Sequence, residues 1–334
     1  MAKRLRRKYS GIGGQAVLEG VMMMNANIYA VAVRKPNGEI EVEKTVLKGN
    51  KEKAFCRRAP FIRGVFQFIN SLTVGNKALQ FSTSFFEEDE KKEKSPKMTK
   101  FKEKMEPIVM ALTTLVAFVI AIAGFMVLPY LLTDFFAKDI HNQFIIAVIE
   151  GVIRIAIFIA YVVLISLMKD IKRLYMYHGA EHKCIDCIET GHPLTVENVL
   201  KSSKVHKRCG TSFMLFVMLV SIVVFFFINV DSMVLRIVLR IALVPVIAGI
   251  SYEIIRLAGR TENIILKIIS APGLWMQGLT TKEPDASMAE VAIASVEAVF
   301  DWRAFLTKEF GYVEEVIAET DEEQDYDYDD EDDL

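Results

Sequence analysis

The sequence predicts a mainly α-helical, multi-pass membrane protein with four membrane-spanning helices, a small cytosolic α+β module at its N-terminus and a disordered acidic tail. Two observations carry this prediction. Hydrophobic residues make up 52% of the chain although 25% of its residues are charged, so the two kinds must be segregated into blocks. Four of the blocks are apolar and long enough to cross a bilayer core of about 30 Å at about 1.5 Å per residue.

The chain before the first apolar block, residues 1–106, is predicted to be the cytosolic module. Residues 29–43 alternate apolar and polar side chains around a Pro-Asn-Gly turn signal, which is typical of a β-hairpin. Apolar residues recur at helical spacing over residues 60–86, so we expect an amphipathic helix that packs on the hairpin or lies on the membrane surface. Residues 87–104 are nearly all charged and predict a linker or an exposed helix extension.

The four apolar blocks divide the rest of the chain. Residues 107–168 are predicted to hold the first two spans and residues 212–258 the third and fourth. Glu150 and Arg154 lie four residues apart in the second span and therefore on one helical face, where an ion pair lowers the cost of burying each charge. The predicted pair packs the helices together.

Two further segments follow the last span. Residues 259–318 predict a cytosolic helical region, and residues 319–334 have too little apolar content to fold. Ten acidic residues lie between Asp321 and Asp333, which leaves 40 basic against 32 acidic residues in the remainder. The body of the chain is therefore basic, and the tail is expected to be disordered.

The short loops set the orientation in the membrane. The loop between the first two spans contains a single basic residue, Lys138, and the loop between the last two contains none, whereas residues 169–210 carry eight. Basic loops stay on the cytoplasmic side, so we expect both termini to be cytoplasmic in a multi-pass protein of the cell membrane. We expect the lipid bilayer as its main partner, with a homo-oligomer as a further expectation, and no nucleic acid.

The loop with candidate chemistry is the cytoplasmic His/Cys loop, residues 169–211. We expect the helix of the second span to continue into it as far as Glu189, and on that helix the sequence His178-Gly-Ala-Glu181-His182 fits the pattern H-x-x-E-H. Histidines four residues apart share a helical face and can both reach one Zn²⁺, with the glutamate beside them as a base for water. The motif predicts a divalent metal site, with zinc as the expected ion.

Four more potential metal ligands follow His182 within 28 residues: Cys184, Cys187, His206 and Cys209. We favour His206 or Cys209 as the third ligand beside the two histidines of the motif. The alternative is a structural zinc site in which Cys184 and Cys187 join His206 and Cys209 and tie the loop together. At about 100° per residue Cys187 points nearly opposite His178, so one metal cannot take both pairs unless the helix breaks.

The position of the motif along the helix bears on the class of enzyme. On a straight helix His178 lies about 15 Å beyond the apolar boundary at Met168, which disfavours an intramembrane protease and favours a substrate whose polar group lies at the inner leaflet. Glu253 would become a further ligand only if the loop folds back to the membrane. Three residues of the N-terminal module are candidates for orienting the substrate: Gln15, Glu19 and Arg63.

Three segments of the chain resemble the YqhQ-like family of bacterial membrane proteins, namely residues 13–22, 177–183 and 206–213. The resemblance extends from about Gly11 to Phe300. This family is a domain of unknown function that is sometimes labelled a predicted metal-dependent enzyme, and it implies no particular reaction. Its pattern includes the motif histidines and glutamate with His206 and Cys209, and it does not centre on the other two cysteines.

Two functions of different classes follow from these observations. The first is a metal-dependent hydrolase at the cytoplasmic face of the membrane, in which His178 and His182 hold the metal and Glu181 activates water. The alternative is a non-catalytic membrane scaffold or transporter accessory, in which the His/Cys cluster is structural. Loss of activity on Glu181→Gln with the metal retained would separate the first from the second.

Overall fold

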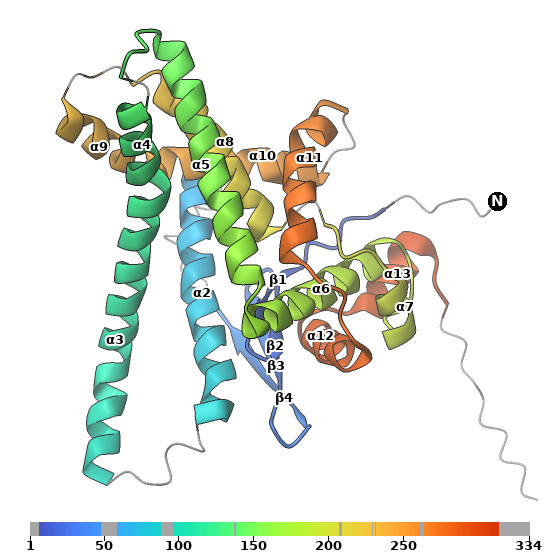
Figure 1. Cartoon of the computed structure of the whole chain (residues 1–334). Helices are drawn as coiled ribbons and strands as arrows, with labels where there is room; N and C mark the ends of the chain where they lie inside the picture. Colours follow the sequence, from blue (N-terminus) through green and yellow to red (C-terminus); the bar gives the residue numbers. More distant parts are fainter. Residues whose placement is uncertain are drawn as a thin grey trace, which may run out of the picture.

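The computed structural model describes residues 7–47, 59–87, 96–136, 138–206, 209–228, 230, 232–260 and 264–313. Most of these residues are helical, and the strands form one small sheet near the N-terminus. Figure 1 shows long upright helices beside that sheet, with several shorter helices gathered around it. The predicted tail, residues 319–334, lies outside the described residues.

The N-terminal sheet is an antiparallel meander with the strand order β1-β2-β3-β4. Its strands are β1 (Gly13–Val17), β2 (Gly20–Asn25), β3 (Ile28–Arg34) and β4 (Ile40–Val46). The predicted hairpin corresponds to β3 and β4, whose register pairs Arg34 with Ile40 across the turn. Strands β1 and β2 were not predicted because their glycines hide the alternating pattern.

Two hydrophobic cores lie on opposite faces of the sheet. Helices α6 (Lys169–Glu189) and α12 (Ala286–Val299) cover one face, where Met23 and Ala32 lie in a core with Tyr177 and Ala292. The other face packs on α2 (Ile62–Glu87), through residues that include Val31 and Val74. Parts of three segments that are far apart in the sequence therefore share one folded unit, because none of them buries enough apolar surface alone.

Two described helices are long and apolar enough to cross a membrane. One runs through α3 (Pro96–Ile122), the π-helical turn η2 (Ala123–Val127) and α4 (Leu128–Phe136), and the other is α5 (Gln143–Ser166). Helices α9 (Met233–Ala242) and α10 (Val244–Arg260) meet at a bend of 40° and form a third candidate if they count as one broken span. Pro245 explains the bend, since a proline in the first turn cannot continue the hydrogen bonding of the preceding helix.

The third predicted span corresponds to a shorter apolar helix. Helix α8 (Gly210–Phe226) has 17 residues and is shorter than the two candidate spans. The described structure thus provides two candidate spans, or three with the bent pair, against the four that the sequence predicts. The remaining helices are α7 (Val196–Lys201), α11 (Ile264–Thr280) and α13 (Trp302–Phe310).

The prediction that the second span continues as one straight helix to Glu189 is wrong. Helix α5 ends at Ser166, Met168 takes an extended conformation with ψ of 134°, and α6 begins at Lys169. In Figure 1, α6 runs across the view below the lower ends of α5 and α11. The break lets α6 bury the side chains of its second half against the sheet and α12, so the distance of 15 Å that assumes a straight helix no longer describes His178.

Candidate metal centre

Three side chains that can bind a metal converge at the buried half of α6. His178 and His182 lie one turn apart on that helix, with ring centroids separated by 4.4 Å. Cys209 is the residue just before α8, and its Sγ lies 3.3 Å from Nε2 of His178. One ligand atom from each of the three lies within 4.8 Å of the other two. These residues could hold one metal ion, as the spacing of the histidines predicts.

Two backbone carbonyls orient the imidazole rings. Nδ1 of His178 lies 3.0 Å from the carbonyl oxygen of Thr280, and Nδ1 of His182 lies 2.6 Å from that of Lys204. A carbonyl only accepts hydrogen bonds, so each Nδ1 must carry the hydrogen and donate it. In the neutral ring this leaves the lone pair on Nε2, which is the atom that faces the cluster in both residues. The same arrangement orients histidine ligands in known metal sites.

Glu181 lies beside this cluster and is almost fully buried. Its Oε2 is 3.8 Å from Nε2 of both His178 and His182. The backbone N–H of Gly14 in β1 donates a hydrogen bond to the carboxylate. A Cβ at Gly14 would lie 3.1 Å from Cγ of Glu181 and 2.4 Å from the carbonyl oxygen of Met22. The glycine therefore lets the edge strand approach and orient the glutamate.

Burial and mutual charge shift the pKa values of these groups. Burial acts to raise the pKa of the Cys209 thiol, but the imidazoles of His178 and His182 outweigh it and hold this pKa well below its usual range. Burial acts to lower the pKa of His178, yet the neighbouring thiolate raises it to about 9. Burial raises the pKa of Glu181 above 4.5. The cluster thus favours a thiolate, which is the form of cysteine that binds metals.

The two candidates for the third ligand have different surroundings. Cys209 belongs to the group of convergent ligand atoms, whereas the Nε2 of His206 lies 3.5 Å from a carboxylate oxygen of Glu189. The backbone of His206 is held on both sides by the side chain of Gln277, which accepts from its N–H and donates to its carbonyl. His206 thus lies near the cluster, with its ring 5.8 Å from that of His182, and pairs with another residue.

The two cysteines of the alternative zinc site lie in the hydrophobic core. Cys184 and Cys187 are both fully buried, and the thiol of Cys187 lies 3.4 Å from the carbonyl oxygen of Pro193. Burial raises the pKa of Cys187 to about 11 and that of Cys184 well above its ordinary value. Within the described residues neither cysteine belongs to a group of potential ligand atoms. Both therefore have the surroundings of packing residues.

Comparison with known proteins places the chain in a family. The family model described as "Protein of unknown function (DUF1385)" matches residues 59–302, which is more than half of the chain. The chain belongs to the DUF1385 family. "Uncharacterized protein YqhQ" from Bacillus subtilis (strain 168) is 35% identical over 286 residues, covering 85% of this chain and 90% of the relative. No solved structure matches.

These comparisons confirm the resemblance to the YqhQ-like family. The DUF1385 match contains the whole of α6 and Cys209, and it begins after the described part of the sheet. Neither comparison names a reaction, a substrate or a metal. The function of this DUF1385 protein therefore has to be inferred from its site.

The three residues that were candidates for orienting a substrate occupy different places in this DUF1385 chain. The carboxamide of Gln15 lies against Gly75 of α2, since a Cβ there would be 2.7 Å from Nε2 of Gln15. Glu19 forms an ion pair with Arg173 and accepts a hydrogen bond of 3.2 Å from the hydroxyl of Tyr177. Glu19 therefore ties the sheet to α6.

Arg63 and Glu253 form an ion pair with each other between α2 and α10. Glu253 was a candidate metal ligand on the condition that the loop folds back to it. Within the described residues the group of convergent ligand atoms does not include it. Its partner Arg63 is engaged in the same pair, so the two residues tie α2 to α10.

Several groups that shape the site were not predicted from the sequence. The carbonyls of Thr280 and Lys204 orient the histidines, and backbone acceptors leave no signal in a sequence. Thr211 places its hydroxyl 3.0 Å from Sγ of Cys209. Gly14 could have been predicted to matter, because it lies in one of the three segments that resemble the YqhQ-like family and no turn requires a glycine at this position.

Proposed function

We propose that this protein is a metal-dependent hydrolase at the cytoplasmic face of the cell membrane, with His178, His182 and Cys209 as metal ligands. The observation that carries the proposal is the pair of hydrogen bonds from Nδ1 to backbone carbonyls, which turns Nε2 of both imidazoles toward Sγ of Cys209. Three ligands from nitrogen and sulfur suit zinc and leave a fourth position open, as in catalytic rather than structural zinc sites.

The chemistry follows from the groups around the ligands. When bound, a zinc ion would polarise the substrate and make a water molecule more acidic. Glu181 lies within 3.8 Å of both imidazole Nε2 atoms, close enough to accept a proton from a water molecule between them. Burial raises the pKa of Glu181 toward neutral pH, and a general acid or base works most efficiently when its pKa lies near the operating pH. The N–H of Gly14 holds its carboxylate in place.

The location of the site supports a substrate at the inner leaflet. The sheet, α6, α12 and α13 gather toward the lower end of α5 in Figure 1, and α6 begins three residues after α5 ends. We propose that α8 and the bent pair α9–α10 complete four spans, with both termini on the cytoplasmic side because the loops on that side hold the basic residues. A homo-oligomer stays a prediction, since α8 already packs against α5, α10 and α11 of the same chain.

Metal content per chain tests this proposal. We expect the wild type, purified in detergent, to hold close to one zinc ion, and His178→Ala/His182→Ala and Cys209→Ser to lose most of it, because each removes an essential ligand. Cys184→Ser/Cys187→Ser is the matched control, since both thiols are buried in the same helix and are not ligands in this proposal. The measurement is inductively coupled plasma mass spectrometry.

The control also separates the alternatives. Metal lost only from Cys184→Ser/Cys187→Ser would make the site a structural one. A wild type without metal in any preparation would overturn the metal centre and leave a non-catalytic scaffold.

A further inference from the structure

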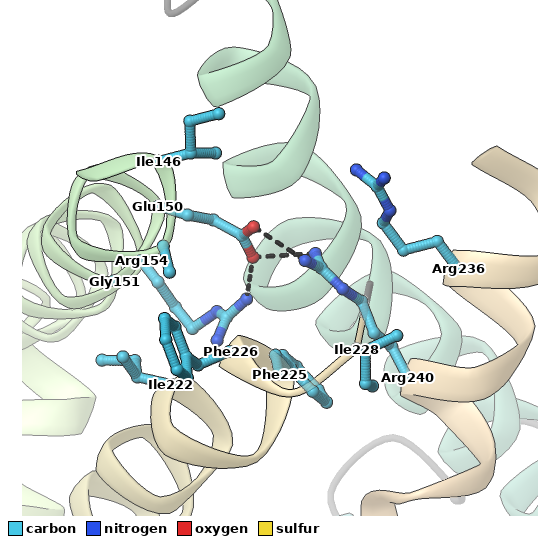
Figure 2. Close-up of a pocket in the computed structure, with 11 residues that line it drawn as sticks. Ile146, Glu150, Gly151, Arg154, Ile222, Phe225, Phe226, Ile228, Arg236 and Arg240 are labelled. Atoms are coloured by element: carbon cyan, nitrogen blue, oxygen red, sulfur yellow. Dashed lines mark hydrogen bonds and ion pairs between the residues drawn. The ribbon is translucent and has the colours of Figure 1, made fainter. Parts of the chain in front are cut away.

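A second polar site lies between the apolar helices, remote from the metal centre. Helices α5, α8 and α9 line a pocket of about 40 Å³, drawn in Figure 2. It contains Glu150 of α5, 16 residues before the end of that helix and thus about 24 Å along its axis. Its other charged residues are Arg154, Arg236 and Arg240. Charged side chains in an apolar bundle are costly and therefore indicate a function.

The glutamate is shared by two arginines. Arg240 donates two hydrogen bonds of 2.7 Å to the carboxylate of Glu150, and Arg154 forms the pair with Glu150 that its spacing predicts. Arg154 also donates to the hydroxyl of Ser221 at 2.8 Å. All three charged side chains are buried. One carboxylate therefore neutralises one of two guanidinium groups, and a positive charge is left over.

The third arginine adds to this excess. Arg236 donates to the carbonyl oxygen of Val230, a neutral group, and Figure 2 shows its side chain beside the pocket with no link to the other charged residues. Among the described residues that line the pocket, Glu150 is the sole acid. The charges of the lining therefore sum to an excess of two positive charges.

Aromatic rings reduce the cost of this charge without neutralising it. The guanidinium carbon of Arg240 lies 4.9 Å from the ring centroid of Tyr130 and 5.0 Å from that of Phe225. Arg154 lies at the same distance of 5.0 Å from Phe225. Such contacts stabilise a cation through the quadrupole of the ring, which carries no net charge. An anion is still needed to balance the site.

Two buried donors in the pocket lack a partner. The Nε atoms of Arg154 and Arg240 make no hydrogen bond within the described part of the chain. Buried N–H groups are rarely left unpaired, and an unpaired group in a native structure indicates a missing water, ion or ligand. The unpaired atoms belong to the two most buried arginines of the site, so the missing partner is an acceptor.

We propose that this pocket binds a phosphate group. Guanidinium groups form paired hydrogen bonds with phosphate oxygens, and a phosphate group offers more acceptor oxygens than a carboxylate to the several donors that line this pocket. The volume has room for a few water molecules or one small oxyanion.

The phosphate could come from a phospholipid headgroup or from free phosphate, and the rim favours the lipid. Phe226, which lines the pocket, is 43% exposed, and Ile146 and Ala147 are partly exposed beside it. An apolar rim of this kind suits an acyl chain that enters with the headgroup.

Binding by detergent-purified protein tests the proposal with two probes. Dihexanoyl phosphatidylglycerol is titrated by native mass spectrometry, and radiolabelled inorganic phosphate is measured by equilibrium dialysis. We expect the wild type to bind the lipid, and Arg236→Gln to bind it at least tenfold more weakly, because this variant removes one positive charge and leaves both partners of Glu150 in place. Arg256→Gln is the control, since Arg256 lies on α10 near Glu253 and outside the pocket.

Each outcome decides the question. Binding of the lipid alone assigns the site to headgroups, and binding of inorganic phosphate that Arg236→Gln weakens assigns it to free phosphate. Glu150→Gln removes the acid and is expected to tighten binding of either probe about threefold or more. A wild type that binds neither probe, or an Arg236→Gln protein that binds as the wild type does, overturns the proposal. Neither result depends on the metal centre.

Discussion

Glu181→Gln is expected to keep the metal and to lower hydrolysis by about 10²–10⁴-fold, the usual contribution of a general base. Glutamine has nearly the same shape and can still accept the hydrogen bond from Gly14, so the cluster of ligands should persist. It cannot take a proton from water. The measurement is turnover of metal-loaded protein in vesicles, with a panel of ester, amide and phosphoester probes, beside zinc content.

The pH profile gives this prediction a second readout. A general base works only when deprotonated, so wild-type activity should fall as the pH drops through the pKa of Glu181, which burial raises above 4.5. The variant should lose that dependence along with its activity. Asp170→Asn is the control, because Asp170 is exposed in the first turn of the same helix. A Glu181→Gln protein with normal turnover would favour the non-catalytic scaffold.

Gly179→Ala is expected to cost about 3 kcal/mol of folding stability or more, at the upper end of the range for overpacked sites. A Cβ at this position would lie 2.0 Å from the carbonyl oxygen of Lys282, and a backbone atom cannot move aside as a flexible side chain can. The backbone N–H of Lys282 also donates a hydrogen bond of 2.9 Å to the carbonyl of Tyr175 in α6. This bond holds the loop after α11 against α6 at the point where the clash would arise.

The metal centre should respond to the same change. The loop begins just after Thr280, whose carbonyl orients His178, so pushing the loop away should also weaken metal binding. Thermal unfolding in detergent and zinc content are the two measurements. Gly278→Ala is the matched control: it lies within α11 with no atom near its would-be Cβ, and alanine there should stabilise the helix by about 0.5–1 kcal/mol. A Gly179→Ala protein that melts with the wild type would contradict the close approach.

The ion pairs of Glu150 show which contacts can be predicted from spacing along the chain and which cannot. Glu150 and Arg154 lie four residues apart, and the structure confirms the pair that this spacing predicts. Arg240, the second partner of Glu150, lies 90 residues further along the chain. No periodicity links positions so far apart, since only the packing of α9 beside α5 brings them together.

The strands of the sheet likewise divide into those that the sequence predicts and those that it does not. The hairpin of β3 and β4 has a turn signal and alternating side chains, so it could be predicted. Strands β1 and β2 contain three glycines, which lower strand propensity, and they form because the ladder and the packing on α6 stabilise them. The straight extension of α5 was wrong for a related reason, since burial of α6 on the sheet favours a break at Met168.

By itself the sequence determined the segregation of apolar and charged blocks, the hairpin, and the placement of His178, Glu181 and His182 on one helical face, because each depends on neighbours within a few residues. The tertiary structure alone decided that Cys209 joins the histidines and that Cys184 and Cys187 pack in the core. That choice depends on where the start of α8 meets α6 and on which carbonyls accept from the imidazoles. These are contacts between distant segments, and the free energy of burying them together is not encoded in any local pattern.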